Sequence, residues 1–290
     1  MKKILLVIFV LLIFLQFCFN QIAEAKVEFS RDLFESLAKN KNKIPNIDLP
    51  NYKRLKLNNG LIIYLIEDHS LPTVELTGYI KSGRRYETRK IAGISNFMFE
   101  MMNTGTKDFN EQELAKYKEL HGIDISFNVA NDYVKFSGNA LSTDSNQLVS
   151  LLANIIKRPD FEAKYFNRIK QEIAHNLLLA KTKEESLLNM YFYKNIYKEH
   201  PYSFSYDLDL RKNALANINS NKLKEFFQQT IGANNTVLGI VGDINLKEME
   251  QLIKNNFNNW SKKEVAIEFP KVKIDKNNYH RIILVNKPDA

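Results

Sequence analysis

Histidine, cysteine and acidic side chains can hold a metal ion or activate a nucleophile, and in this 290-residue chain the histidines are few and scattered. The five histidines are His69, His121, His175, His200 and His280. No two of them stand three or four positions apart, the spacing that presents two imidazoles from neighbouring turns of one helix. Neither G-x-S-x-G nor a Gly-rich phosphate loop occurs. Serine-nucleophile and phosphate-loop chemistry are therefore not indicated, and His69, His121 and His280 are interpreted as ordinary surface or core residues.

The stretch AGISNFMFEMMNTGT, residues 92–106, predicts a helix over about 91–103. At 100° per residue, an apolar stripe forms from Ile94, Phe97, Met98 and Met101. The opposite side of the same helix carries Asn96, Phe99, Glu100 and Asn103, and this is where a site could lie. The methionines of this helix are interpreted as flexible, gap-filling core residues.

Strand and helix patterns along the rest of the chain define the frame around that helix. Strands are expected on both sides of Asn59-Gly60 in the range 54–68, and at 73–83, 123–140 and 235–244. Asn110 with Glu113 resembles a capping box that starts a helix ending near 120. Further helices are expected at about 144–157, 161–181, 184–198, 220–230 and 245–260. This order predicts an α+β fold, with helices packed on one face of a mostly antiparallel sheet.

The N-terminus has the three parts of a secretory signal peptide. Lys2 and Lys3 precede an apolar run over residues 4–15, and Ala23 and Ala25 supply a cleavage signal. We expect cleavage after Ala25, a mature chain in the secreted or periplasmic space, and no stable membrane span. A retained anchor is the alternative, although the apolar run is short for a bilayer. Cleavage removes Cys18, the only cysteine, so an internal disulfide is excluded.

The net charge of +8 is scattered along the chain, and no basic stripe with interleaved aromatic residues is present. Nucleic acid is therefore not an expected partner. Domain boundaries are expected as a signal peptide (1–25), a polar lead-in segment (26–50), a domain over 51–260, a linker (261–279) and the first strand of a second domain (280–290) that the sequence truncates.

Several stretches together resemble the insulinase/pitrilysin family of zinc metallopeptidases, which includes the mitochondrial processing peptidases. They are LNNGLIIYLIEDHSLPTVEL (57–76), KSGRRYETRKIAGISNF (81–97), GT (105–106), HPYSFS (200–205) and GIVGDI (239–244) followed by Trp260. The resemblance implies that the zinc motif H-x-x-E-H should occupy positions 96–100, with a third ligand from a later helix at Glu172. The chain instead has Asn96 and Glu100 at the positions of the two histidines, and Phe99 at the position of the general base.

Each of these residues weakens the implied zinc chemistry. An asparagine amide is a poor zinc ligand beside imidazole, and phenylalanine cannot accept a proton. Glu172 is one turn after Arg168, so it could equally be a solvated helix residue in an ion pair. A replacement set of Glu100, Glu172 and His175 is the remaining way to hold a metal. We expect no catalytic residue, no metal ligand and no cofactor in this chain, and regard Asn96, Phe99, Glu100 and Glu172 as vestigial site positions.

The resemblance implies a function for such a chain, because some family members pair a zinc-bearing subunit with a silent one. The first hypothesis is a catalytically silent subunit of a heterodimeric zinc metallopeptidase that helps to enclose peptide substrate, with zinc held by the active partner. The second is a stand-alone peptide-binding or scaffold protein with a degenerate peptidase fold. The third is a divergent active metalloendopeptidase.

Overall fold

The computed structural model describes residues 50–264 and 282–285 of the chain. The predicted signal peptide, nearly all of the lead-in segment, most of the predicted linker and both ends of the predicted final strand lie outside these residues. Residues 282–285 of that predicted strand form no strand, since no described strand pairs with them. No helix in the described ranges combines the length and the apolar character needed to cross a bilayer.

The centre of the fold is a six-stranded sheet in the order β1-β2-β6-β3-β5-β4. Its strands are β1 (Lys53–Lys56), β2 (Ile62–Glu67), β3 (Thr73–Ile80), β4 (Asp124–Val129), β5 (Val134–Leu141) and β6 (Thr236–Gly242). Every neighbouring pair is antiparallel except β2 and β6, which run parallel. The mostly antiparallel sheet expected from the sequence is confirmed.

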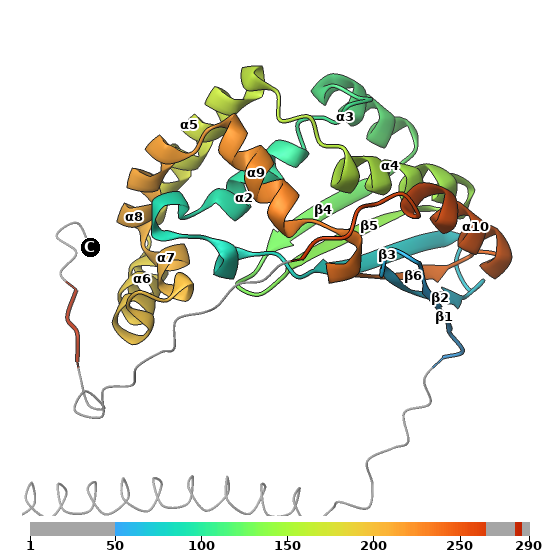
Figure 1. Cartoon of the computed structure of the whole chain (residues 1–290), viewed down its shortest axis with the longest axis horizontal. Helices are drawn as coiled ribbons and strands as arrows, with labels where there is room; N and C mark the ends of the chain where they lie inside the picture. The colour runs from blue at the N-terminus through green and yellow to red at the C-terminus, as the bar shows by residue number, and fades with distance from the viewer. Residues whose placement is uncertain (1–49, 265–281, 286–290) are drawn as a thin grey trace, which may run out of the picture. The chain divides into compact units, whose positions relative to one another are not determined.

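Among the described residues, the helices cover one face of the sheet (Figure 1). Along β3, Val74, Leu76 and Ile80 are buried, while the alternate residues Glu75 and Tyr79 are exposed. This period-two pattern is the signature of a strand with one face in the core and one in water. The helices therefore pack on a single face, as the sequence predicts.

Nine α-helices are assigned within the described ranges. They are α2 (Ile94–Met102), α3 (Glu111–Leu120), α4 (Ser145–Lys157), α5 (Ala163–Ala180), α6 (Glu184–Tyr197), α7 (Pro201–Tyr206), α8 (Leu208–Ala214), α9 (Ser220–Thr230) and α10 (Leu246–Phe257). The expected capping box is present: the Asn110 side chain accepts from the backbone N–H of Glu113, whose carboxylate accepts from the N–H of Asn110. The sequence patterns did not predict α7, which begins within the HPYSFS stretch, or α8, which follows that stretch.

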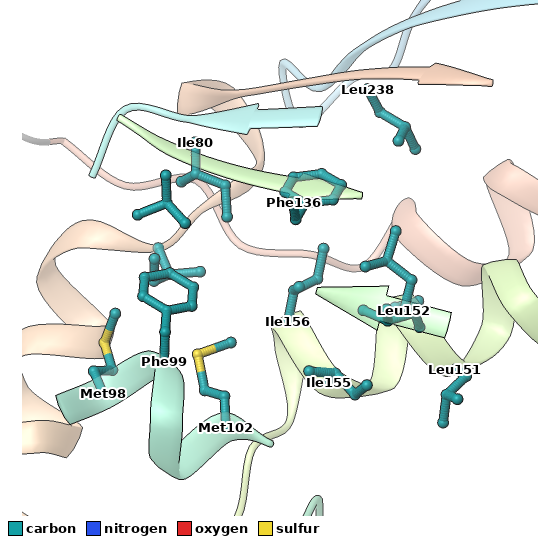
Figure 2. Packing of buried hydrophobic residues seen from close by; sticks show 14 of the residues in the cluster. Ile80, Met98, Phe99, Met102, Phe136, Leu151, Leu152, Ile155, Ile156 and Leu238 are labelled. Atoms are coloured by element: carbon teal, nitrogen blue, oxygen red, sulfur yellow. The ribbon is translucent and has the colours of Figure 1, made fainter. Parts of the chain in front are cut away.

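The core lies between the sheet and the helices that cover it. Figure 2 shows Met98, Phe99 and Met102 extending from α2 toward the strand that carries Ile80, beside the apolar side of α4. The whole predicted apolar stripe of α2 is fully buried, at 0% exposure for Ile94, Phe97, Met98 and Met101. Helix α2 is thus fixed by core packing along most of its length.

Candidate functional site

A buried carboxylate holds the N-terminus of α2. Gly93, in the left-handed conformation at φ 91°, precedes the helix and has no side chain with which to cap it. Glu87 takes that role, since its carboxylate accepts hydrogen bonds from the backbone N–H of Gly93 at 2.7 Å and of Ser95 at 3.1 Å. Burial raises the pKa of Glu87, whereas the N–H of Gly93 and the charge of Arg211 act in the opposite direction.

Arg211 of α8 completes this anchor from a distant part of the sequence. Its guanidinium is buried and lies in the electrostatic range of Glu87, and its Nη1 donates to the carbonyl of Ser205 at 3.3 Å. A Cβ atom at position 93 would lie 3.3 Å from the Arg211 Nε. The glycine at the start of α2 therefore serves both the positive φ and the close approach of Arg211.

The next turn of α2 carries the positions that the sequence marked as vestigial. Asn96 is half-buried, and its Oδ1 accepts a hydrogen bond from the Nε of Arg84 at 3.3 Å. Arg84 begins the short 3₁₀ turn Arg84–Tyr86, which follows β3. A side-chain cation thus lies beside the position at which the resemblance implies the first zinc-binding histidine.

Phe99 does not lie on an open face, and that expectation is wrong. The side chain is only 3% exposed and contacts Phe127 of β4 with ring centroids 5.2 Å apart. Phe99 is buried although it lies off the predicted apolar stripe, because α2 packs on more than one side, against β4 as well as against α5 and α9. The position at which the resemblance implies a general base is therefore filled by a core phenylalanine.

The two glutamates expected near one another do interact. Helix α5 packs on α2, with Phe97 and Phe166 stacked at a centroid distance of 4.8 Å. Burial raises the pKa of Glu100, and the negative charge of Glu172 raises it further, so the two carboxylates lie within electrostatic range of each other. This is the proximity that the predicted alignment requires of position 172, although its assignment as a vestigial ligand stays a prediction.

Glu172 also has the ion pair that the sequence suggested. Its Oε1 accepts from Nη1 of Arg168, one turn earlier on α5, at 3.1 Å, and the same guanidinium contacts Glu111 of α3 at 2.5 Å. The Glu172 side chain is 51% exposed, so this pair contributes little to stability. Glu172 is therefore engaged on the surface rather than held in a closed ligand set.

The histidines form no replacement site in this structure. His69 contacts Asp243 and His121 contacts Asp144, each at 2.6 Å, and His200 caps α7 by accepting from the N–H of Tyr202. His175 is exposed, and His280 lies outside the described residues. Within the described ranges there is no group of three or more His, Cys, Asp or Glu side chains that could hold a metal ion. Glu100, Glu172 and His175 thus do not converge.

Zinc is the metal that the family resemblance implies, and the residues at this site do not fit it. The first histidine position carries Asn96, whose amide is hydrogen-bonded to the guanidinium of Arg84. The second carries Glu100, which lies in electrostatic range of another glutamate. The general-base position faces the core. A catalytic zinc site needs three nitrogen, sulfur or oxygen ligands around one point, with a fourth position open for water.

A polar and aromatic cluster beside the site was missed by the sequence analysis. The Tyr202 hydroxyl donates to Asp132 at 2.6 Å, and Asp132 also pairs with Arg85 at 3.1 Å. Burial and the Asp132 carboxylate together raise the pKa of Tyr202 to about 12. Tyr193 stacks on Tyr206 with centroids 3.7 Å apart. The recurrence of tyrosine in 191–206 was the available signal, but its partner in the β4–β5 turn is distant in sequence.

Two family models match successive parts of the chain. The model described as insulinase (peptidase family M16) matches residues 62–206, half of the chain, and the one described as peptidase M16 inactive domain matches residues 217–290. The chain therefore belongs to the insulinase family, peptidase family M16.

Individual relatives agree with that assignment. The chain is 22% identical over 202 residues to the zinc protease YmxG of Bacillus subtilis, covering 69% of this chain and 49% of that protein. It is 24% identical over 216 residues to cytochrome b-c1 complex subunit 1 of Bos taurus, covering 73% and 44%. A protease from Helicobacter pylori has a similar solved structure, with a TM-score of 0.70, 20% identity and coverage of 79% and 55%. Pitrilysin gives a TM-score of 0.69 at 21% identity, covering 79% of this chain and 25% of that one. The chain thus spans about half the length of the first of these relatives and less of some others.

Proposed function

We propose that the chain is a catalytically silent member of the insulinase family that binds peptide and acts beside a zinc-bearing peptidase subunit. The observation that carries the proposal is the altered second turn of α2. Arg84 donates a hydrogen bond to Asn96, and the position of the general base is occupied by Phe99, whose side chain is buried in the core. Zinc would be held by the partner and not by this chain.

The location and the partner are parts of the same proposal. A mature chain beginning at Lys26 would reach the periplasm or the outside of the cell, where extracytoplasmic peptides are available. The absence of cysteine from that mature chain suits an oxidising compartment. The relatives support the peptidase family, since YmxG is described as a zinc protease.

Metal content is the first test of catalytic silence. The purified chain should contain no stoichiometric zinc, by elemental analysis, and should not cleave unfolded peptides. About one zinc per chain, lost in a Glu172→Ala variant, would instead establish a divergent metal site and contradict the proposal.

A ligand-restoring variant tests whether α2 is the family's zinc helix. The double change Asn96→His and Glu100→His places two imidazoles one turn apart, with Glu172 on the neighbouring helix as third ligand. We expect it to bind zinc clearly more tightly than the unmodified chain, measured by competition with a chromogenic chelator. Adding Glu172→Ala should remove most of that gain. A folded double variant with no gain in affinity would show that the predicted alignment of these positions is wrong.

Co-expression tests the partnership itself. An H-x-x-E-H protein of the same family from the same genome, expressed with this chain, should form a stable heterodimer that cleaves peptides faster than that protein alone. If the two chains stay separate and the chain alone binds unfolded peptide, the stand-alone binding hypothesis replaces the heterodimer.

A further inference from the structure

Four arginines surround the start of α2, and three of them have a carboxylate nearby. Arg85 pairs with Asp132 at 3.1 Å, Arg89 pairs with Glu199 at 3.2 Å, and Arg211 interacts with the buried Glu87. Arg84 differs from the other three. Among the described residues the only hydrogen bond of its side chain goes to the neutral amide of Asn96, and no carboxylate lies within 4.0 Å of the guanidinium.

The charged groups described around the start of α2 are either positive or engaged with other partners. The positive charge of Arg84 contributes to lowering the pKa of Arg211, so the two guanidinium groups repel each other. Of the three carboxylates of this region, Asp132 and Glu199 pair with Arg85 and Arg89. The third, Glu87, accepts from the N–H groups of Gly93 and Ser95, and lies fully buried beside Arg211. The N-terminus of α2 adds a partial positive charge of its own. The start of α2 therefore has an excess of positive charge that is expressed at Arg84.

The geometry of Arg84 leaves its binding end available. The hydrogen bond to Asn96 uses Nε, so it orients the guanidinium without occupying either terminal nitrogen. A guanidinium presents its terminal nitrogens as a fork that matches a carboxylate with two parallel hydrogen bonds. Arg84 is half-buried, a position in which such a charge-assisted bond is stronger than in open water.

We propose that Arg84, oriented by Asn96, is a recognition site for a carboxylate of a bound peptide. The inference rests on the proposed peptide-binding function and gives it a specificity. At position 96 the resemblance implies a zinc-binding histidine. This chain has Asn96 there with the guanidinium of Arg84 beside it, and this fixed cation would hold an acidic residue of the peptide without cleaving the peptide. Glu100, one turn further along α2 and next to Glu172, would repel a second acidic side chain there, so that one acidic residue is preferred over a run of them.

Three matched peptides test the inference on the full chain. The first is a short unstructured peptide with one central glutamate and an amidated C-terminus. The second has glutamine in place of the glutamate, and the third has that glutamine together with a free C-terminal carboxylate. Fluorescence anisotropy should show about tenfold tighter binding of the glutamate peptide than of the amidated glutamine peptide, the gain expected from one charge-assisted hydrogen bond.

Two variants separate recognition by Arg84 from general charge. Arg84→Gln should remove the preference by weakening only the glutamate peptide, and Arg84→Lys should keep a part of it, since lysine retains the charge but loses the fork. Arg89→Gln is the matched control, because Arg89 is an exposed arginine five positions later that already pairs with Glu199, and it should leave the preference intact. Equal affinity for both amidated peptides, or a preference that survives Arg84→Gln, would overturn the inference. A preference for the free C-terminal carboxylate over the glutamate would assign the carboxylate to the peptide end and support the same chemistry.

A second readout does not depend on peptide binding. Glutarate, a small dicarboxylate, should shift the Nε–Hε resonance of Arg84 in a nitrogen-15 spectrum and leave that of Arg89 in place. If glutarate shifts the Arg84 resonance selectively but none of the three peptides binds, the carboxylate site is supported and the proposed peptide-binding function is contradicted. If the peptides bind without a glutamate preference and glutarate causes no shift, the peptide-binding function is supported and the carboxylate site at Arg84 is contradicted.

Discussion

The first and second turns of α2 differ in how their charged groups are held. In the first turn, Glu87 is fully buried, accepts two backbone N–H groups and lies beside the buried Arg211. In the second turn, Asn96 is half-buried with one long hydrogen bond, and Glu100 is exposed with another carboxylate in range. The first turn is a closed network, whereas the polar positions of the second turn, Asn96 and Glu100, are incompletely paired and partly or fully exposed to solvent.

This difference explains how a peptidase helix can keep its place without its catalytic residues. Removing one member of a buried, mutually paired network leaves another member desolvated and uncompensated, which is costly. Replacing the half-exposed or exposed polar residues of the second turn costs little, because water satisfies the polar groups that lose a partner. The position of α2 is therefore fixed by residues that take no part in metal binding, and the second turn is free to change.

The largest effect should follow from removing the anchor. Glu87→Ala leaves the Arg211 guanidinium buried without its carboxylate and removes the cap of α2, so the free energy of unfolding should fall by about 3–5 kcal/mol. Urea unfolding followed by circular dichroism measures the loss. Glu199→Ala is the control, since Glu199 is 77% exposed in its pair with Arg89 and should cost less than about 1 kcal/mol. Similar losses in both variants would contradict the distinction between the two turns.

A somewhat smaller loss is expected at Phe99. Phe99→Ala opens a cavity between α2 and β4 and should destabilise the fold by about 3 kcal/mol. Phe192→Ala makes the same change on α6 at a side chain that is 53% exposed, and should cost about 0.5 kcal/mol or less. Thermal unfolding of both variants compares the two positions. If Phe99→Ala were as mild as the control, position 99 would belong with the exposed polar positions of the second turn and not with the core.

The smallest effect concerns the acidic side of the second turn and depends on pH. Folding raises the pKa of Glu100, through burial and then through Glu172, so the folded state binds more protons than the unfolded state between the ordinary and the raised pKa. The stability that Glu100 contributes is present below its ordinary pKa and is lost as pH rises through the raised value. Glu100→Gln should therefore stabilise the chain by about 0.5 kcal/mol at neutral pH and by nothing at acid pH.

Paired unfolding curves at neutral and acid pH check this expectation. Glu225→Gln is the control, because its carboxylate pairs with Lys222 at 2.9 Å and its removal should give no stabilisation at either pH. A gain at Glu100 that is the same at both values would mean that titration of this carboxylate is not its cause.

Local signals were sufficient for most of the elements. Strand-like apolar segments, the Asn59-Gly60 turn signal and the alternation in 123–140 placed all six strands, and the Asn110–Glu113 pair marked the start of α3. Helices α7 and α8 were missed although their signals are present: Pro201 follows the cap His200, and the Asp207 side chain accepts from the N–H of Leu210. Short helices have too few turns to show an apolar period, so their caps are the only evidence for them.

The site was predictable in position but not in packing. The helix could be placed by resemblance, and the structure brings Glu172 within electrostatic range of Glu100, while the assignment of Glu172 as a vestigial ligand stays a prediction. The burial of Phe99 could not be foreseen, because a helical wheel describes one core-facing side and α2 packs on several. The Glu87–Arg211 interaction joins residues more than a hundred positions apart, and nothing in either local sequence indicates the other.

The parallel pairing of β2 with β6 has a consequence for synthesis on the ribosome. Strand β6 lies between β2 and β3, which do not pair with each other, so the sheet consists of two partial sheets joined by the last of the described strands to be made. Until Gly242 has left the exit tunnel, β2 and β3 each expose an unpaired edge. Such edges are templates for intermolecular pairing, and closing long-range contacts is slow. The interval between the synthesis of β5 and that of β6 is therefore the period in which the nascent chain most needs a chaperone, and slowing translation within residues 142–235 should lower the yield of soluble protein.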